Sequence, residues 1–291
     1  MSKYLIITFL FLFTVTIVNG QKKVSKNTFD TIPQRVIYKI INADTLKMDI
    51  YKPFTFKKKK KYPTIVFFFG GGWNGGTITQ FEPQAKYFAS RGMVTVLVDY
   101  RVKNKHKTTP FEAVNDAKSA IRFLREHAKE YTINPNKIVA SGGSAGGHLA
   151  AATALLSGLE EKEEDLTISS KANALVLYNP VIDNSEKGYG YDRVGTRYLE
   201  ISPMHNIKKG APPTLFMLGS KDVLIPESTA YLYQDKMEAI NSRCDVIIYD
   251  GQGHGFFNQW KKEGLEYYKR TTIAADKFLQ SIGYLKGKAT L

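Results

Sequence analysis

Ser144 stands at the centre of a Gly-x-Ser-x-Gly pattern, residues 142–146, between a short apolar segment and an alanine-rich one. A serine hydroxyl is a weak nucleophile until it is held clear of the backbone beside a base. A sharp strand-to-helix turn holds it there, and glycines on either side leave room for that turn. The pattern therefore predicts Ser144 as the nucleophile. Ser141 is the local competitor, but Val139 occupies the position where this pattern needs glycine.

A second glycine cluster, residues 70–72, follows an apolar run that ends at Phe69. Glycine amides can turn inward because no Cβ interferes. Two or three of these N–H groups, together with that of Ala145, are suited to stabilising the oxyanion of a tetrahedral intermediate. A flexible glycine turn is the plainer interpretation. Trp73 follows directly, and it either forms a wall of the substrate site or belongs to the core.

A base and an acid complete the chemistry. His254 lies on a glycine-rich loop, residues 249–257, which leaves its imidazole free to reach Ser144. Asp222 lies just beyond an expected strand end, where a carboxylate can orient the imidazole and stabilise its protonated form. Asp183, one strand earlier, is the rival acid. The order serine, aspartate, histidine is that of α/β-hydrolases. The other histidines are His106, His127, His148 and His205, of which we expect His148 to pack behind the nucleophile and His127 to lie on a helix surface.

The elements that must position these groups alternate along the chain. Strands are expected at residues 35–41, 45–51, 64–69, 93–98, 137–140, 174–178, 214–218 and 245–249, and helices at residues 80–90, 111–130, 147–157, 229–240 and 259–282. This alternation predicts one α/β domain over residues 28–291, with a mostly parallel eight-stranded sheet covered by helices on both faces. Catalytic groups in such sheets lie at the carboxyl ends of the strands.

Six segments together make the chain resemble a known family: residues 69–73, 99–101, 111–125, 141–148, 219–226 and 253–256. They are similar to α/β-hydrolases of the acetyl esterase/lipase type, close to the branch of hormone-sensitive-lipase-like and bacterial feruloyl or acetyl-xylan esterases. The resemblance implies an α/β-hydrolase fold. It also implies hydrolysis of carboxylic esters through an acyl-enzyme, without a cofactor or a metal.

The resemblance also carries residue roles onto this sequence. It implies a triad of Ser144, Asp222 and His254, and an oxyanion hole made by the amides of Gly71, Gly72 and Ala145. Esterases of this type usually have histidine where Phe69 stands, so we expect a less firmly anchored loop with its donors intact. The segment 99–101 is similar to one that braces the site. A long N-terminal cap is missing, and residues 182–209 form the expected short cap.

The composition excludes several other classes of protein. A chain that is 43% hydrophobic and 23% charged is neither disordered nor a multi-span membrane protein. One cysteine, Cys244, cannot form an intrachain disulfide or a multi-thiolate zinc site. The net charge is +14, yet the lysines are dispersed apart from the run at residues 57–61, so no nucleic-acid partner is expected. A solvated loop explains that run, and attraction of an anionic polymer is the alternative.

Residues 1–20 have the pattern of a secretory signal peptide. Lys3 precedes an apolar run, residues 4–18, that is too short to cross roughly 30 Å of hydrocarbon, and small residues follow before a polar break. Cleavage before Gln21 would leave a net charge of +13, since only Lys3 is lost from +14. We expect a secreted or periplasmic protein without stable membrane insertion. An uncleaved anchor is the alternative.

Together these patterns predict a secreted serine esterase that removes short acyl groups, acetyl or feruloyl, from polysaccharides. Because the cap is short, the site should be open, and Trp73 and Tyr189 are the expected substrate contacts, with structural roles equally reasonable for each. A general carboxylesterase or lipase of small esters is the first alternative. A peptidase of the prolyl-oligopeptidase kind lacks its propeller domain, and a non-catalytic binding module would typically have lost a triad member.

Overall fold

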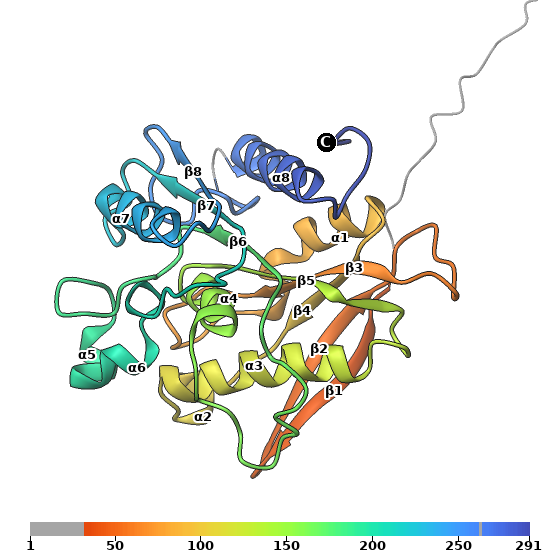
Figure 1. The fold of residues 1–291 in the computed structure, drawn as a ribbon, viewed down its shortest axis with the longest axis horizontal. Coiled ribbons are helices and arrows are strands. Elements are labelled where there is room, and N and C mark those ends of the chain that lie inside the picture. Colours follow the sequence, from red (N-terminus) through yellow and green to blue (C-terminus); the bar gives the residue numbers. More distant parts are fainter. Residues whose placement is uncertain (1–31, 262–263) are drawn as a thin grey trace, which may run out of the picture. The chain divides into compact units, whose positions relative to one another are not determined.

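Eight strands form one sheet in the order β1-β2-β4-β3-β5-β6-β7-β8 (Figure 1). The computed structural model describes residues 32–261 and 264–291, so the predicted signal peptide lies outside the described residues. β2 runs antiparallel to β1 and β4, and the other neighbours are parallel. The strands are β1 Gln34–Ile41, β2 Asp44–Tyr51, β3 Tyr62–Phe68, β4 Val94–Val98, β5 Ile133–Gly143, β6 Ala174–Tyr178, β7 Thr214–Gly219 and β8 Cys244–Tyr249.

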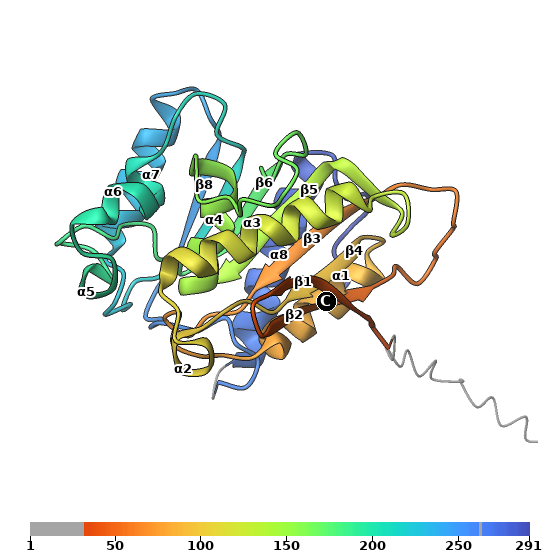
Figure 2. The ribbon, with the colours of Figure 1, turned by 90° about the horizontal axis from the view of Figure 1, so that it is seen from below.

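Helices cover both faces of this sheet, which confirms the predicted α/β-hydrolase architecture. Helices α3, α4 and α7 pack on one face of the sheet, and helices α1 and α8 pack on the other (Figure 2). Side chains of the first three helices belong to one buried core cluster, and side chains of α1 and α8 belong to the other. The helices are α1 Glu82–Ser90, α2 Lys103–His106, α3 Pro110–Glu126, α4 Ala145–Leu155, α5 Tyr191–Val194, α6 Tyr198–Ile201, α7 Glu227–Glu238 and α8 Gly264–Ser281. The predicted short cap corresponds to the segment with α5 and α6, between β6 and β7.

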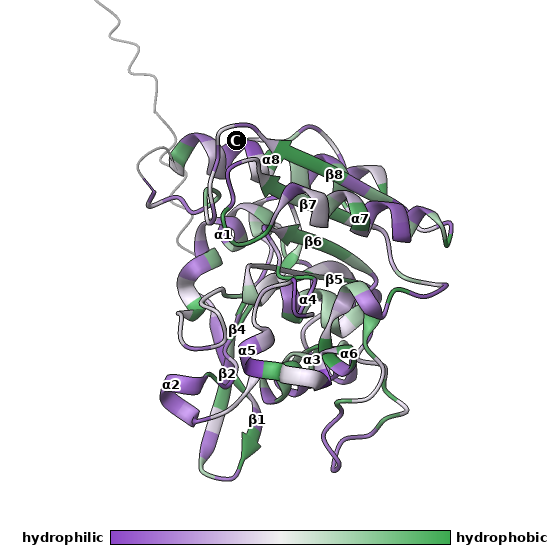
Figure 3. Ribbon diagram, turned by 90° about the vertical axis from the view of Figure 1, so that its left-hand side faces the viewer, coloured by the Kyte–Doolittle hydropathy of each residue, from purple (hydrophilic) through white to green (hydrophobic). Residues whose placement is uncertain are grey.

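The central strands are apolar because helices bury them from both sides. All residues of β4 and β6 are buried, and Figure 3 shows β6 as hydrophobic and the short helix α2 as hydrophilic. At the sheet edge β1 exposes Ile37 and Ile40, while Tyr38 faces the core. The sheet thus forms a rigid platform whose carboxyl edge can hold catalytic loops.

Three predicted boundaries differ from the structure by four or more residues. Helix α8 begins at Gly264, five residues after the predicted start at residue 259. Helix α3 ends at Glu126, four residues before the predicted end, because His127 leaves helical geometry at its C-cap. Strand β5 begins at Ile133, four residues before the predicted start, because that residue pairs with Tyr62 of β3. The asparagines and the proline at residues 134–136 are typical of a turn, yet this segment belongs to strand β5.

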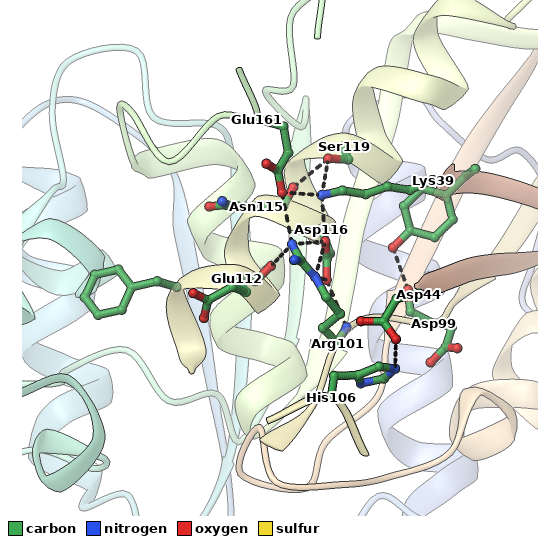
Figure 4. A network of polar contacts seen from close by, with 12 residues as sticks. Lys39, Asp44, Asp99, Arg101, His106, Glu112, Asn115, Asp116, Ser119 and Glu161 are labelled. Atoms are coloured by element: carbon green, nitrogen blue, oxygen red, sulfur yellow. Dashed lines mark hydrogen bonds and ion pairs between the residues drawn. The ribbon is translucent and has the colours of Figure 1, made fainter. Parts of the chain in front are cut away.

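A buried ion network lies where β1, α3 and the segment after β4 meet (Figure 4). The carboxylate of Asp116, which has no exposed surface, accepts hydrogen bonds from Lys39 Nζ at 2.6 Å and from Arg101 Nε and Nη2 at 2.8 Å each. Glu161 accepts from the same two cations, at 2.7 and 2.9 Å. Four segments far apart in sequence are thereby joined by charged hydrogen bonds that are buried at Asp116 and partly exposed at Glu161.

The same network holds the residues under the first glycine loop. Arg101 follows Tyr100, whose hydroxyl donates to the carbonyl of Phe69 at 2.7 Å. The ring of Tyr100 stacks on that of Phe69 with centroids 4.1 Å apart. The segment 99–101 therefore links the ion network to residues 69–72.

No helix within residues 32–261 and 264–291 combines the length and the apolarity that crossing a membrane requires.

Asp116→Ala should lower the free energy of unfolding by about 3–5 kcal/mol, because it leaves the buried charges of Lys39 and Arg101 with only the partly exposed Glu161 as a shared partner. Urea denaturation followed by circular dichroism measures this loss. Glu200→Ala is the control, since its pair with Arg197 is exposed and its removal should leave the midpoint nearly unchanged. Equal midpoint shifts for the two variants would contradict a structural role for the network.

Candidate active site

Ser144 occupies the turn between β5 and α4 with φ 54° and ψ −120°, a strained conformation for a residue with a side chain. Close packing enforces the turn: a Cβ on Gly146 would lie 2.1 Å from the carbonyl oxygen of Phe68. A Cβ on Gly142 would lie 2.4 Å from Gly146. Glycine is therefore required at both positions, and the serine side chain is directed away from the strand.

Ser144, His254 and Asp222 form one chain of hydrogen-bonding distances. His254 Nε2 lies 2.9 Å from Ser144 Oγ, and His254 Nδ1 lies 2.7 Å from Asp222 Oδ2. A carboxylate accepts, so Nδ1 carries the proton and Nε2 is left to accept the serine proton. The amides of Leu224 and Ile225 donate to Asp222 Oδ1 at 2.9 and 3.0 Å, which fixes the orientation of the carboxylate. The structure thus brings the three predicted side chains together.

The rival residues have other partners. The hydroxyl of Ser141 is buried and donates to the carbonyl of Val176 at 2.8 Å. The carboxylate of Asp183 accepts from the amide of Ser185 within the cap segment. His106 accepts from the amide of Val102, at the start of α2.

The predicted oxyanion donors surround the serine. Gly70, Gly71 and Gly72 line the same pocket as Ser144, and Gly71 and Gly72 have φ values of 131° and 60° that favour glycine. In the described part of the chain, the amides of Gly71, Gly72 and Ala145 have no hydrogen-bond acceptor. The amide of Gly70 donates instead to Gln80 Oε1 at 2.5 Å. Two loop amides and that of Ala145 are therefore available to donate hydrogen bonds to an oxyanion.

The loop is anchored by aromatic packing where a histidine was expected. Phe69 is buried, it stacks on Tyr100, and its carbonyl accepts from the Tyr100 hydroxyl. A Cβ on Gly76 would lie 2.3 Å from the Phe69 ring, so the ring fills the space under the loop. Phe69 therefore supports the loop by packing and not by a side-chain hydrogen bond.

The pocket in front of Ser144 has a volume of about 370 Å³. Tyr189 lines it, whereas Trp73 does not and is only 2% exposed. The ring of Trp73 packs edge-on against that of His148, with centroids 5.0 Å apart. Of the two roles expected for Trp73, a place in the core is therefore the one that the structure shows. Trp260 was not singled out from the sequence, yet it lines the pocket and is 62% exposed. Its neighbours in sequence carry no motif, so only the fold reveals it.

Asn179 is a buried pocket residue that the sequence did not indicate. It follows β6, its Oδ1 accepts from the amide of Gly255 at 3.1 Å, and its Nδ2 lies 3.4 Å from His254 Nε2. The contact to Gly255 fixes the loop that carries the imidazole. Asn179 therefore positions His254 from the segment that follows β6, two strands away from β8 in the sheet.

A second bridge joins the two catalytic loops. Gln80 accepts from the amide of Gly70 and donates through Nε2 to Asn258 Oδ1 at 3.1 Å. Asn258 in turn donates to the carbonyl of Gly255 at 2.8 Å. The glycine loop and the histidine loop are thus held at a defined separation.

His148 lies on α4 behind the nucleophile and is buried, as expected from its position. Its Nε2 lies 2.9 Å from the carbonyl of Ile201 in α6, so it ties the cap segment to the core. Burial lowers the pKa of His148 to about 4, which keeps the imidazole neutral. The role of His148 is therefore structural, and within the described part of the chain no hydrogen bond joins its ring to Ser144 Oγ.

Two family models match the chain. The BD-FAE model matches residues 48–187, and the dienelactone hydrolase family model matches residues 170–285. Together they span the strands that carry all three residues of the hydrogen-bonded chain.

The chain is similar to the solved structures of esterase 2 from Thermogutta terrifontis. The apo form is 45% identical over 88% of this chain and 97% of that one, with a TM-score of 0.84. It is also similar to esterase LipC of Mycobacterium tuberculosis, 27% identical over 68% of this chain and 54% of the relative. The acetylxylan esterase of Xylanibacter ruminicola is 28% identical over 68% of this chain and 42% of the relative. The chain thus spans about half the length of the curated relatives it matches.

Asn179→Ala should reduce kcat by roughly threefold to tenfold with little change in KM, because one neutral hydrogen bond that positions the base is lost. Steady-state hydrolysis of p-nitrophenyl acetate measures both constants.

Asn173→Ala is the matched control. Asn173 Oδ1 also accepts a hydrogen bond from a backbone N–H, that of Ile138 in β5 at 3.0 Å, and Asn173 does not line the catalytic pocket. If both variants kept the wild-type kcat while losing similar stability, Asn179 would have no positioning role.

The pH dependence of stability should report the buried neutral His148. Between pH 7 and pH 5 the unfolded chain takes up a proton at this residue that the folded chain does not. Stability should therefore fall by about 2 kcal/mol over that window from this group. His148→Gln should lose about that much of the acid sensitivity, measured as the difference between denaturant midpoints at the two pH values. An unchanged difference in the variant would exclude the effect.

Proposed function

We propose that this chain, which belongs to the esterases of the α/β-hydrolase fold, is a serine esterase that removes short acyl groups from polysaccharides. The membership itself was expected from the glycine and serine motifs, and similarity along most of the chain confirms it. The hydrogen-bonded chain of Ser144, His254 and Asp222, facing a pocket beside unpaired amides, is the observation that carries the proposal.

In the first half-reaction Ser144 Oγ attacks the ester carbonyl carbon while His254 Nε2 takes the hydroxyl proton. The carbonyl electrons move to oxygen, which then accepts hydrogen bonds from the amides of Gly71, Gly72 and Ala145. Asp222 stabilises the imidazolium that forms. Collapse of the intermediate breaks the bond to the alcohol, which leaves with the proton from His254, and an acyl-enzyme remains.

In the second half-reaction a water molecule replaces the alcohol. His254 takes one proton from the water as its oxygen attacks the acyl carbon, and returns that proton to Ser144 Oγ when the carboxylic acid leaves. The same amides stabilise the second oxyanion. No cofactor enters this sequence of steps.

Short acyl groups are favoured by the size and setting of the pocket. Its volume of about 370 Å³ is at the small end for ligand sites, and Gly70 and Gln80 form part of its wall. Esterase 2 of Thermogutta terrifontis has been solved with propionate and with butyrate bound, which are short carboxylates. The similarity to that esterase supports acetyl and other short acyl groups as the substrates here.

A polysaccharide as the alcohol is supported by two observations. The exposed indole of Trp260 beside the pocket offers a face on which a sugar ring can stack. One of the relatives is an acetylxylan esterase. Export through the predicted signal peptide would bring the enzyme to such polymers, so we include secretion or a periplasmic location in the proposal.

A general carboxylesterase of small esters is the second candidate. The similarity to LipC and to LipM, a probable carboxylic ester hydrolase of Mycobacterium tuberculosis, favours it, as does the open pocket. The two candidates share the same chemistry and differ only in the alcohol.

Ser144→Ala should abolish labelling by a fluorophosphonate probe and reduce ester hydrolysis by about 10⁴-fold or more, because the attacking oxygen is removed. Wild-type protein should cleave p-nitrophenyl acetate faster than long-chain esters and should release acetate from acetylated polysaccharides. Ser141→Ala is the matched control and should keep its labelling. Labelled Ser144→Ala protein would refute the nucleophile, and absence of acetate release from polymers would favour the general carboxylesterase.

A further inference from the structure

A second pocket of about 360 Å³ lies against the first glycine loop and is lined by basic side chains. We call it the basic pocket, and its lining includes Trp73, Asn74, Lys103, Lys107, Thr108 and Arg193. Lys103 and Lys107 come from α2 and its C-cap, and Arg193 comes from α5 in the cap segment. Three elements that are separate in sequence therefore converge on one concave surface.

The basic pocket carries excess positive charge. Among the residues that the structure describes, no carboxylate lies within ion-pair distance of Lys103 or Lys107. Asp192 is the acidic residue in the lining, and it lies 3.7 Å from Arg193 Nε with its side chain 77% exposed. Lys107 Nζ donates to the carbonyl of Asn104 at 3.2 Å, which leaves its charge unneutralised, so two lysines line the pocket without an acidic partner.

Two buried polar atoms of the lining residues also lack partners. Trp73 Nε1 and Thr108 Oγ1 are both shielded from solvent, and neither has a hydrogen-bond partner in the described part of the chain. Because both atoms are shielded from solvent, a ligand in the pocket does not reach them as the side chains stand, and the positive charge of the lining is what favours an anionic ligand.

The basic pocket shares a wall with the catalytic pocket. Asn74 lines both. The guanidinium of Arg193 lies 5.7 Å from the centre of the Trp73 ring and 5.4 Å from that of Tyr189, and it donates to the carbonyl of Gly72. A sugar chain whose acyl group lies at Ser144 can therefore present a neighbouring substituent to the basic pocket.

We propose that the basic pocket binds an anionic group, a carboxylate or a sulfate, on the sugar chain next to the acylated residue, and so selects acidic polysaccharides. This inference rests on the proposed function, in which the alcohol of the ester belongs to a polysaccharide, but it concerns residues other than the catalytic ones. The lysine run at residues 57–61 lies between β2 and β3 and is not part of this pocket.

The test removes two charges from the pocket and, as a matched control, two from the run. Lys103→Ala with Lys107→Ala keeps the backbone bond from the amide of Lys103 to the carbonyl of Trp73, and neither lysine side chain lines the catalytic pocket. Lys58→Ala with Lys59→Ala is the control. KM is measured for acetate release from acetylated polygalacturonate and from acetylated neutral xylan, and for hydrolysis of p-nitrophenyl acetate.

The pocket variant should raise KM on the order of tenfold for acetylated polygalacturonate alone, while the control variant changes it little. Equal changes in both variants would mean that total charge attracts the polymer, and would overturn a specific pocket. An equal change on neutral xylan or on p-nitrophenyl acetate would also overturn it, because no anion is present there.

A direct binding measurement distinguishes a carboxylate from a sulfate as the preferred anion. It also tests the basic pocket independently of whether the proposed esterase function holds. Calorimetry with Ser144→Ala protein compares trigalacturonate, a sulfated oligosaccharide of equal length and neutral xylotriose. Tighter binding of either anion, lost in the pocket variant, supports the proposal and names the group. If neither anionic oligosaccharide binds more tightly than xylotriose, the proposal is overturned, even where acetate release from neutral polymers supports the esterase proposal.

Discussion

The backbone of Ser144 is the constraint around which the site is built. Its amide donates to the carbonyl of Tyr178 at 3.0 Å, and its carbonyl accepts from the amides of His148 and Val181 at 3.0 and 3.1 Å. The turn is therefore held by β6, by α4 and by the segment after β6 at once. Because these bonds compensate the unfavourable φ, the hydroxyl stays at the carboxyl edge of the sheet, at the positive end of α4.

The rest of the site is arranged on that fixed point through contacts between loops. Gln80 and Asn258 bridge the glycine loop and the histidine loop, and Asn179, which directly follows β6, holds the histidine loop. Under the glycine loop, Tyr100 links Phe69 to Arg101 and so to the buried carboxylate of Asp116. Preorganised donors are useful only if their loops keep this geometry during the reaction. The buried ion network thus contributes to the chemistry through the loop that it supports.

The cap segment between β6 and β7 sets what surrounds the chemistry. Tyr189 forms part of the catalytic pocket, and the guanidinium of Arg193 lies against the rings of both that tyrosine and Trp73, on the side of the basic pocket. His148 ties the cap to α4 through the carbonyl of Ile201. A short cap held in this way leaves the catalytic pocket open while it divides the surface into two neighbouring pockets.

Much of this arrangement follows from local sequence, and the rest depends on long-range contacts. The turn at Ser144 could be predicted because its glycine requirement is contained in five residues, and the apolar periodicity predicted the sheet. Asn179, Gln80 and Arg193 could not, since their partners His254, Asn258 and Gly72 lie 75, 178 and 121 residues away. Trp73 was an expected substrate contact, yet the fold buries it in the core and exposes Trp260 at the pocket. The sequence by itself determined the strained turn and the order of the reactive groups, because both arise from neighbouring residues. Only the tertiary structure decided which side chains support and surround them, because packing joins segments that no local pattern relates.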